Sequence, residues 1–282
     1  MMFPSISEHD RVYAIGDIHG RGDALIDLLR MILDDAARGA DDRQTRIVFL
    51  GDYIDRGDDP ARVIGYLRSL MSETGDGIVA LKGNHEAALV DFLKDPIAGR
   101  LWLSHGARQT IASYGVPLPP TRPTPDDLRR LRDALATAMG DDIGFLAGLP
   151  THYRLGSVLF THAGCNPGLG DGTEDEHSLL WGHRNGLCDE PLPGVLLVHG
   201  HYESVDPVQS AGRISLDTGA WHTGRLTAVC IDSNLRFLST RSATPDRQIE
   251  ASPRPAVDDW ISRKLRVPTG LALRLRRFSS PA

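Results

Sequence analysis

The chain has 282 residues, of which 41% are hydrophobic and 24% are charged, and its formal net charge is −6. This length and hydrophobic content permit a large buried core in a single α/β domain. The negative charge argues against non-specific nucleic-acid binding by the whole chain, and no apolar run reaches the roughly eighteen residues of a membrane span.

Three short apolar runs in the first third of the chain each end at a string of glycines and polar residues. The runs are residues 12–15, 47–50 and 78–81, and the strings that follow are GDIHG (16–20), GDYIDRG (51–57) and GNHE (83–86). Such runs are typical of strands buried on both faces. Apolar residues at helical spacing follow each string, in segments 25–33, 63–70 and 88–92. The pattern therefore predicts three β-loop-α units with their strings at the carboxyl ends of the strands, where open α/β sheets bind ligands.

The next segment, residues 95–150, differs in character from these units. It contains several prolines between 117 and 125, followed by apolar residues at helical spacing from Leu128 to Met139. We expect a loop-and-helix insertion over the strand ends that forms one wall of the substrate cleft and influences specificity. The helix is equally compatible with merely covering the sheet, and Trp102 with a place in the core.

Further apolar runs follow the insertion. Residues 158–160 lead into THAG (161–164), and 195–198 lead into HGH (199–201). Runs at 214–216, 226–231 and 235–238 are closely spaced with no helix expected between them, which predicts an antiparallel or mixed sheet. We interpret Asp217, after the first of these runs, as stabilising a turn. The whole pattern predicts a pair of packed sheets with helices outside.

The residue types in the strings indicate metal-assisted phosphate chemistry. Carboxylate, imidazole and amide ligands without paired cysteines suit divalent ions such as Mn²⁺, Fe²⁺ or Zn²⁺. Asp52, on the second of three strands, is the natural bridge between two ions that hold a hydroxide. The guanidinium of Arg56 suits a phosphate, and His85 is placed to protonate a leaving oxygen, with Asp55 raising its pKa. The alternative is that Asp55 and Arg56 only pair with each other across a turn.

Together the three strings resemble the signature of the phosphoprotein phosphatase family of metallophosphoesterases, in its bacterial serine/threonine phosphatase branch. The likeness runs from about residue 10 to about residue 240. It implies a calcineurin-like metallophosphoesterase fold of the α/β class, in which two packed mixed β-sheets are flanked by helices in four layers (αββα).

The resemblance also implies a set of metal ligands for two divalent ions, with Mn²⁺ expected in vitro and Fe or Zn as alternatives. The first ion would take Asp17, His19 and the bridging Asp52, and the second would take Asp52, Asn84, His162 and His201. His199 competes with His201, because it stands where eukaryotic members have arginine. We prefer His201, which follows a glycine.

The same resemblance assigns the remaining roles. His85 and Asp55 would form the catalytic acid pair, and Arg56 would hold the substrate phosphate. A second phosphate-binding arginine is expected after a Leu-Trp pair, and Arg184 occupies that place. The expected reaction is direct in-line hydrolysis of phosphomonoesters by a hydroxide that bridges two metals, without a phosphoenzyme.

As the substrate class, we favour phosphoserine or phosphothreonine in proteins. The related symmetrical diadenosine tetraphosphatases typically lack the aspartate of DRG and carry aspartate after GNH, so Asp55 and Glu86 favour a protein phosphatase. One alternative is a symmetrical bis(5′-nucleosyl)-tetraphosphatase or another small-molecule phosphatase. A further alternative, from another class, is a catalytically inactive module that binds phosphorylated partners.

We predict a metallophosphoesterase domain over residues 1–240, which includes the insertion, and a C-terminal extension over 241–282. The extension holds nine Arg or Lys and four Asp or Glu, a balance of +5. The N-terminus lacks the basic-then-apolar pattern of a signal peptide, so we expect a cytoplasmic protein. The expected partner is a phosphorylated protein or small phosphorylated substrate, with no nucleic acid and no membrane, and the oligomeric state is left open.

Overall fold

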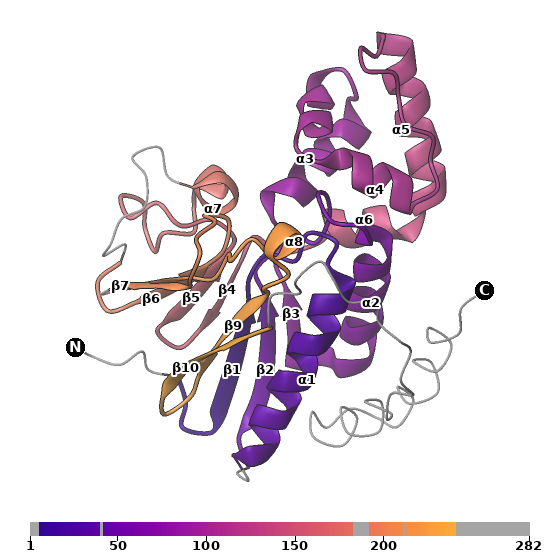
Figure 1. The fold of residues 1–282 in the computed structure, drawn as a ribbon. Coiled ribbons are helices and arrows are strands. Elements are labelled where there is room, and N and C mark those ends of the chain that lie inside the picture. The colour runs from indigo at the N-terminus through magenta and orange to yellow at the C-terminus, as the bar shows by residue number, and fades with distance from the viewer. Residues whose placement is uncertain (1–5, 40–41, 183–191, 211, 241–282) are drawn as a thin grey trace, which may run out of the picture.

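The three apolar runs form three neighbouring parallel strands, as the sequence predicts. The computed structural model describes residues 6–39, 42–182, 192–210 and 212–240 (Figure 1). In it β1 (Asp10–Ile15) pairs in parallel with β2 (Gln44–Phe49), and β2 pairs in parallel with β3 (Ile78–Ala80). All three strands therefore present their carboxyl ends at the same edge of the sheet.

The predicted helices follow these strands. They are α1 (Gly22–Arg38), α2 (Pro60–Thr74) and α3 (Asn84–Lys94). The first two each bury the stripe of apolar residues that the spacing indicates, including Leu28 and Leu67, in one cluster with Ile15 and Phe49 of the sheet. This cluster is the helix-covered side of the first sheet.

Two late strands return to complete the first sheet. They are β9 (Thr227–Ile231), which is antiparallel to β1, and β10 (Leu235–Ser239), which is antiparallel to β9, giving the order β10-β9-β1-β2-β3. The prediction that no helix separates the late apolar runs is wrong, because a short helix, α8 (Ala220–Thr223), precedes β9. A helix of a single turn is too short to show a periodicity.

The second sheet is also mixed, with the order β4-β5-β6-β8-β7. Its predicted strands are β5 (Val158–Thr161), β6 (Leu196–His199) and β8 (Arg213–Ser215), which run parallel to one another. Two antiparallel edge strands, β4 (His152–Leu155) and β7 (Val208–Ser210), have no counterpart in the prediction. Both are partly exposed, so they lack the continuous apolar character of the central strands.

The two sheets pack face to face through a second apolar cluster. Val12 and Val48 of the first sheet meet Phe160 and Val198 of the second in this cluster. On the outer face of the second sheet, Leu159 and Leu197 pack against Leu179 of the short helix α7 (Glu176–Trp181). The predicted architecture of two packed mixed sheets flanked by helices is thereby confirmed.

The segment after α3, for which the sequence predicts a loop-and-helix insertion, contains several helices. It contains η2 (Ala98–Ser104), α4 (Ala107–Ser113), α5 (Pro125–Met139) and α6 (Asp141–Ala147), while a short turn, η1 (Gly75–Gly77), precedes β3. Figure 1 shows the insertion rising beside the carboxyl ends of the strands. Leu128, Leu131 and Leu135 of α5 are buried, as their spacing predicts. The predicted extension 241–282 lies outside the described residues.

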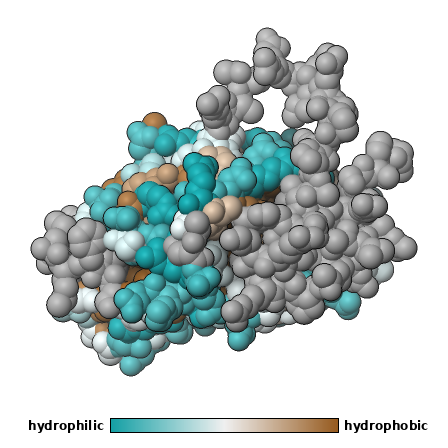
Figure 2. Space-filling model, turned by 90° about the horizontal axis from the view of Figure 1, so that it is seen from below, coloured by the Kyte–Doolittle hydropathy of each residue, from teal (hydrophilic) through white to brown (hydrophobic). Residues whose placement is uncertain are grey.

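The described helices include none that is both long and apolar enough to cross a membrane. Figure 2 views the molecule from below, and the described part of this face is mainly hydrophilic with scattered hydrophobic residues.

One polar network connects strands of the first sheet at the edge opposite the carboxyl ends of β1, β2 and β3. Asp232 Oδ2 accepts hydrogen bonds from Arg11 Nε and Arg236 Nη1, each at 3.0 Å. Burial opposes ionisation, but the Asn234 amide and the two guanidinium groups lower the pKa of Asp232 to about 2. A lowered pKa stabilises the fold above about pH 4, and this contribution disappears as the pH falls towards 2.

We therefore expect Asp232→Asn to lower the free energy of unfolding by about 1–3 kcal/mol at pH 7 and by much less near pH 2. Urea unfolding at both pH values measures this difference. Asp76→Asn, at an exposed position of η1, is the matched control. An equal loss at the two pH values would contradict the assigned role.

Candidate active site

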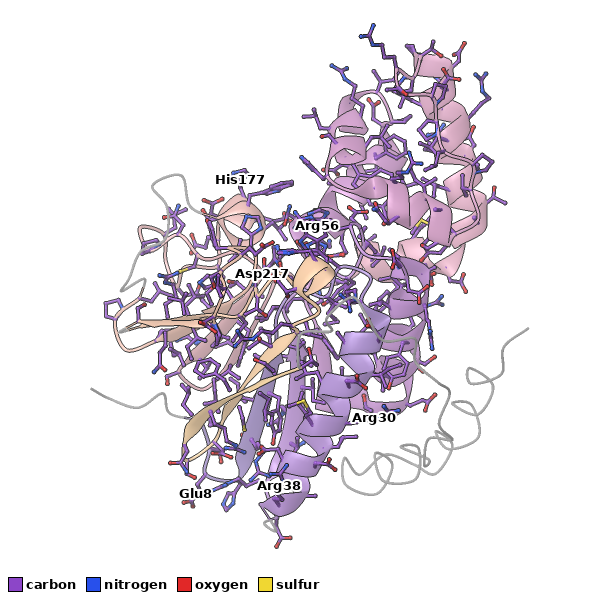
Figure 3. The ribbon with its side chains drawn as sticks, in the orientation of Figure 1. Glu8, Arg30, Arg38, Arg56, His177 and Asp217 are labelled. Atoms are coloured by element: carbon purple, nitrogen blue, oxygen red, sulfur yellow. The ribbon has the colours of Figure 1, made fainter. Side chains whose placement is uncertain are left out.

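The strings at the strand ends meet through backbone hydrogen bonds. Ile18 N and His19 N both donate to Asp52 O, at 3.0 and 2.8 Å, and Gly200 N donates to His162 O at 2.8 Å. In Figure 3, Arg56 and Asp217 lie close together at this end of the molecule, whereas Glu8 and Arg38 lie at the opposite end. His201 N also donates to Asp17 Oδ1 at 3.1 Å, so the strings of the two sheets form one cluster.

Backbone conformation marks the same cluster. In the described part of the chain, the non-glycine residues with positive φ all have φ between 44° and 67°, and they are His19, Asp52, Asp55, Arg56 and His201. Left-handed backbone is uncommon for side chains other than glycine and persists only where the surroundings enforce it. Each of these five is a residue that the sequence places in the site.

One candidate metal group contains Asp52, His162 and His201, whose ligand atoms all lie within 4.8 Å of one another. Asn84 Oδ1 joins them, at 2.8 Å from His162 Nε2 and 3.0 Å from His201 Nδ1. His162 Nδ1 donates to Leu50 O at 3.0 Å, which turns Nε2 towards Asn84 and Asp52. The structure therefore brings together the four residues predicted for the second ion.

A second group contains His19, Asp52 and His85. His19 Nδ1 donates to Ile54 O at 2.7 Å, and its buried Nε2 lies 3.5 Å from Asp52 Oδ2 without a hydrogen-bond partner. Asp17, predicted as a ligand of the first ion, is in neither group, and both its carboxylate oxygens accept from His201 N at 3.1 Å. Asp52 is the residue common to both groups, the place expected of a bridging ligand.

The charges of the cluster fit divalent cations. Burial and the neighbouring carboxylates of Asp217 and Asp52 raise the pKa of Asp17. Burial lowers the pKa of His19 to about 3 and that of His201 to about 4, so both rings are neutral at pH 7. Metals bind neutral imidazole, and a cation relieves the repulsion between crowded carboxylates. Together with the unpartnered His19 Nε2, these features show that the residues present suit metal ions.

The predicted acid pair consists of Asp55 and His85, and His85 is also a member of the second group. His85 Nδ1 is 2.7 Å from Asp55 Oδ2, and His85 Nε2 is 3.8 Å from Asp52 Oδ2. Burial alone would lower the pKa of His85, but Asp52 and Asp55 raise it above its ordinary value. Arg56 Nη2 is 3.1 Å from His85 Nε2, so the guanidinium of Arg56 lies next to the nitrogen from which His85 would donate a proton.

Two sequence alternatives look different in the structure. His199 is buried and belongs to neither candidate metal group, with Nδ1 donating to Gly200 O at 2.9 Å and Nε2 3.4 Å from Arg213 Nη1. His201, rather than His199, is therefore the histidine that the structure brings to the candidate metal group. Arg184, the predicted second phosphate-binding arginine, lies outside the described residues.

A family model described as calcineurin-like phosphoesterase matches residues 10–263. The chain belongs to the calcineurin-like phosphoesterases. The sequence-based identification of a metallophosphoesterase is thus confirmed at the level of the family.

Curated relatives of this phosphoesterase match over shorter segments. Over 76 residues, this chain is 37% identical to serine/threonine-protein phosphatase SIT4 of Candida albicans. The matched segment covers 27% of this chain and 23% of that relative. This chain is also 31% identical over 85 residues to the PP2A-like phosphatase PPG1 of the same organism, covering 30% of this chain and 19% of the relative. The similarity thus spans less than a quarter of each relative.

Solved structures share the fold over most of the chain. A protein serine/threonine phosphatase from Saccharomyces cerevisiae with similarity to human PP5 aligns with a TM-score of 0.53 at 14% identity, covering 86% of this chain and 83% of that chain. A candidate diadenosine tetraphosphatase aligns with a TM-score of 0.51 at 20% identity, covering 84% and 96%. At such identities the likeness shows the fold alone.

Glu86 is a residue of this phosphoesterase whose function the sequence did not reveal. Its buried carboxylate accepts from the backbone N–H groups of Asp52 and Gly83 at 2.9 Å, Tyr53 at 2.8 Å and Ile54 at 3.3 Å. It therefore fastens the loop after β2 to the first turn of α3. The only sequence signal is its place in the GNHE string, at the third position of a helix, where an acidic residue can cap.

Asp217 likewise does more than the sequence indicated. Its Oδ1 accepts from Gly219 N at 2.9 Å, which agrees with the predicted turn. It is also 2% exposed, and burial together with the Asp52 charge raises its pKa to about 6. The turn thus adds a third buried carboxylate next to Asp17 and Asp52.

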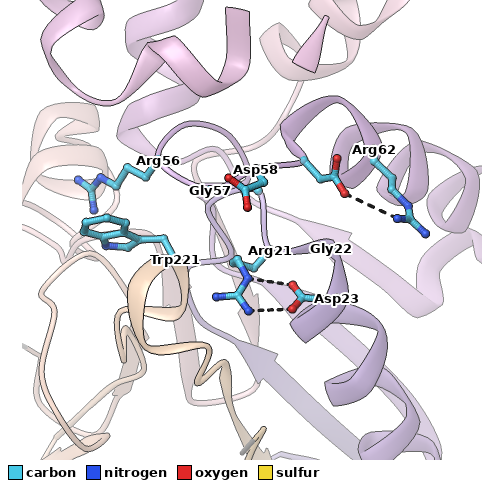
Figure 4. A pocket seen from close by; sticks show the side chains of 10 residues that line it. Arg21, Gly22, Asp23, Arg56, Gly57, Asp58, Arg62 and Trp221 are labelled. Atoms are coloured by element: carbon cyan, nitrogen blue, oxygen red, sulfur yellow. Dashed lines mark hydrogen bonds and ion pairs between the residues drawn. The ribbon is translucent and has the colours of Figure 1, made fainter. Parts of the chain in front are cut away.

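A pocket of about 270 Å³ lies on one side of Arg56, between the loops after β1 and β2. Figure 4 shows Arg56 above the indole of Trp221, which is on α8, and Arg21 paired with Asp23 on the opposite wall. The Arg56 guanidinium carbon is 5.9 Å from the centre of the Trp221 ring, within the range of a cation–π contact. The pocket is therefore contiguous with the predicted phosphate-binding arginine.

We expect Glu86→Gln to loosen the site, because an amide –NH₂ would face backbone N–H groups that need an acceptor. The free energy of unfolding should fall by about 1–3 kcal/mol, and Mn²⁺ should bind more weakly. Urea unfolding and calorimetric titration with Mn²⁺ measure the two effects. Glu176→Gln makes the same change at an exposed position, and equal behaviour of the two variants would contradict the role of Glu86.

Proposed function

We propose that this phosphoesterase is a metal-dependent phosphomonoesterase that acts as a serine/threonine protein phosphatase. The observation that carries the proposal is the His85–Asp55 pair, with its 2.7 Å contact, standing beside Asp52, which belongs to both candidate metal groups. A general acid placed next to a metal-binding cluster and an arginine is an arrangement suited to hydrolysis of a phosphate ester.

In this proposal the chain supplies ligands for two divalent ions. Asp17, His19 and Asp52 would hold the first, and Asp52, Asn84, His162 and His201 the second. When bound, the ions would lower the pKa of a water molecule and draw charge from the phosphoryl oxygens. Mn²⁺ is the ion we propose for experiments in vitro.

The remaining residues handle the substrate. Arg56 directs its guanidinium at the phosphoryl oxygens, a geometry that a planar fork of donors matches. His85 donates a proton from Nε2 to the leaving oxygen, while Asp55 accepts from Nδ1 and holds the ring in place. Water is the nucleophile in a direct, in-line displacement, so the proposal includes no phosphoenzyme.

Two considerations bear on the substrate. The curated relatives with similar segments are serine/threonine-protein phosphatases, which supports a phosphorylated protein. The second candidate is a dinucleoside tetraphosphatase, and the pocket beside Arg56 favours it, because Trp221 is 38% exposed there and offers an aromatic face to a base. The cytoplasmic location stays a prediction.

Metal dependence is the first test of the proposal. We expect hydrolysis of p-nitrophenyl phosphate with Mn²⁺ and its loss after chelation. Asp52→Asn should reduce the metal content and lower kcat/KM on the order of 10²-fold or more, because one ligand serves both ions. Asp76→Asn is the control. Unchanged metal stoichiometry and activity in Asp52→Asn would remove it as the bridge.

The substrate class requires a separate comparison. We expect kcat/KM with Mn²⁺ to be about tenfold or more higher for a phosphothreonine peptide than for diadenosine tetraphosphate. Steady-state kinetics on both compounds measures this ratio. A large preference for the dinucleotide would establish the second candidate instead, and no metal-dependent turnover of either compound or of p-nitrophenyl phosphate would favour an inactive binding module.

A further inference from the structure

The helical insertion reaches into the acid pair. The Asp55 carboxylate is fully buried, and Trp102 of η2 donates from Nε1 to its Oδ2 at 2.9 Å. The same oxygen lies 2.7 Å from His85 Nδ1. One carboxylate oxygen is thus held between the proposed general acid and an indole of the insertion.

The other oxygen is held by α4. The Thr110 hydroxyl donates to Asp55 Oδ1, and its oxygen accepts from Asp55 N at 2.9 Å. Thr110 is fully buried, so its hydroxyl has no competing solvent. Side chain and backbone of Asp55 are therefore fixed by one residue of the insertion, at a position whose φ of 67° needs such support.

Further contacts of the same short segment involve the neighbours of Asp55. Gly106 O accepts from Arg56 N at 3.0 Å, and a Cβ atom on Gly106 would come within 2.7 Å of Arg56 Cγ. The ring of His105 lies 6.1 Å from that of His85, centre to centre. Residues 102–110 therefore contact each of Asp55, Arg56 and His85, although the insertion contributes no residue to the candidate metal groups.

These donors matter because of the cost of a buried charge. A carboxylate removed from water keeps its charge and its orientation only where donors surround it. If a donor were lost, the Asp55 carboxylate could rotate, and it would then hold His85 less well. The ligands proposed for the two ions do not include His85 and would stay in place, so the loss would fall on protonation of the leaving oxygen.

We propose that Trp102 and Thr110 are positioning residues for the general acid, which makes η2 and α4 part of the catalytic apparatus and more than a wall of the cleft. This inference rests on the proposed function, specifically on the role of His85. It predicts that removing either donor changes how the rate depends on the leaving group.

The test compares two substrates of nearly equal shape, p-nitrophenyl phosphate, whose leaving group is good, and phenyl phosphate, whose leaving group is poor. The ratio of their kcat/KM values does not depend on how much of the sample is folded. With Mn²⁺ present, we expect Trp102→Phe and Thr110→Val to raise this ratio about fivefold or more in favour of p-nitrophenyl phosphate. Thr110→Ser, which keeps the hydroxyl, should restore the wild-type ratio.

The matched control is Phe92→Leu. Phe92 packs on Trp102 with ring centres 5.1 Å apart and donates nothing to Asp55, so this variant disturbs the same packing and should leave the ratio unchanged. His85→Asn serves as the reference for complete loss of the acid and should shift the ratio further, with metals still bound. Metal content is measured for every variant.

Each outcome has a distinct meaning. If Trp102→Phe and Thr110→Val lower both kcat/KM values equally, or if Phe92→Leu shifts the ratio as much as they do, the positioning role is wrong. If the wild-type chain shows no metal-dependent turnover, or if His85→Asn loses metal and leaves the ratio unchanged, the proposed function fails instead.

Discussion

The site depends on one buried carboxylate that binds no metal in our proposal. Glu86 accepts hydrogen bonds from four backbone N–H groups, three of them in the loop after β2 and one at the start of α3. A carboxylate without solvent must find donors, and an irregular loop leaves its backbone amides without the partners of a helix or sheet. The backbone amides supply the donors that the Glu86 carboxylate needs, and the carboxylate supplies the acceptor that the amides need. These hydrogen bonds hold in place the loop that carries Asp52, Asp55 and Arg56.

The loops after β1, β2 and β3 also pack closely against one another. A Cβ atom on Gly83 would come within 2.2 Å of Asp52 Oδ1, and one on Gly57 within 2.0 Å of His19 O. Only glycine allows the loops after β1, β2 and β3 to approach so closely. Candidate ligands from three strands can therefore share one small volume, which is what two ions with a common bridge would need.

The sequence predicts what is encoded locally and fails where contacts are long-range. The strands β1, β2 and β3 and the strings after them are recognisable, because buried runs and glycine-flanked polar residues leave a pattern within a few positions. Thr110 and Trp102 meet Asp55 across 55 and 47 residues, and a buried indole or hydroxyl has the same local pattern whether it fills a core or holds a carboxylate. Edge strands β4 and β7 and the one-turn helix α8 are too short or too exposed to leave a period.

The histidines of the site differ in their environment in a way that divides their tasks. Burial lowers the pKa of both His19 and His162, and their Nδ1 atoms donate to the carbonyl oxygens of Ile54 and Leu50. A neutral acceptor fixes the ring without favouring a charge, so Nε2 keeps the lone pair that a metal ion needs. His85 is equally buried, but its Nδ1 faces a carboxylate, and its pKa is raised. The partner of Nδ1 thus distinguishes His19 and His162, which are suited to bind metal, from His85, which is suited to donate a proton. The insertion supports the role of His85, because it holds the carboxylate of Asp55.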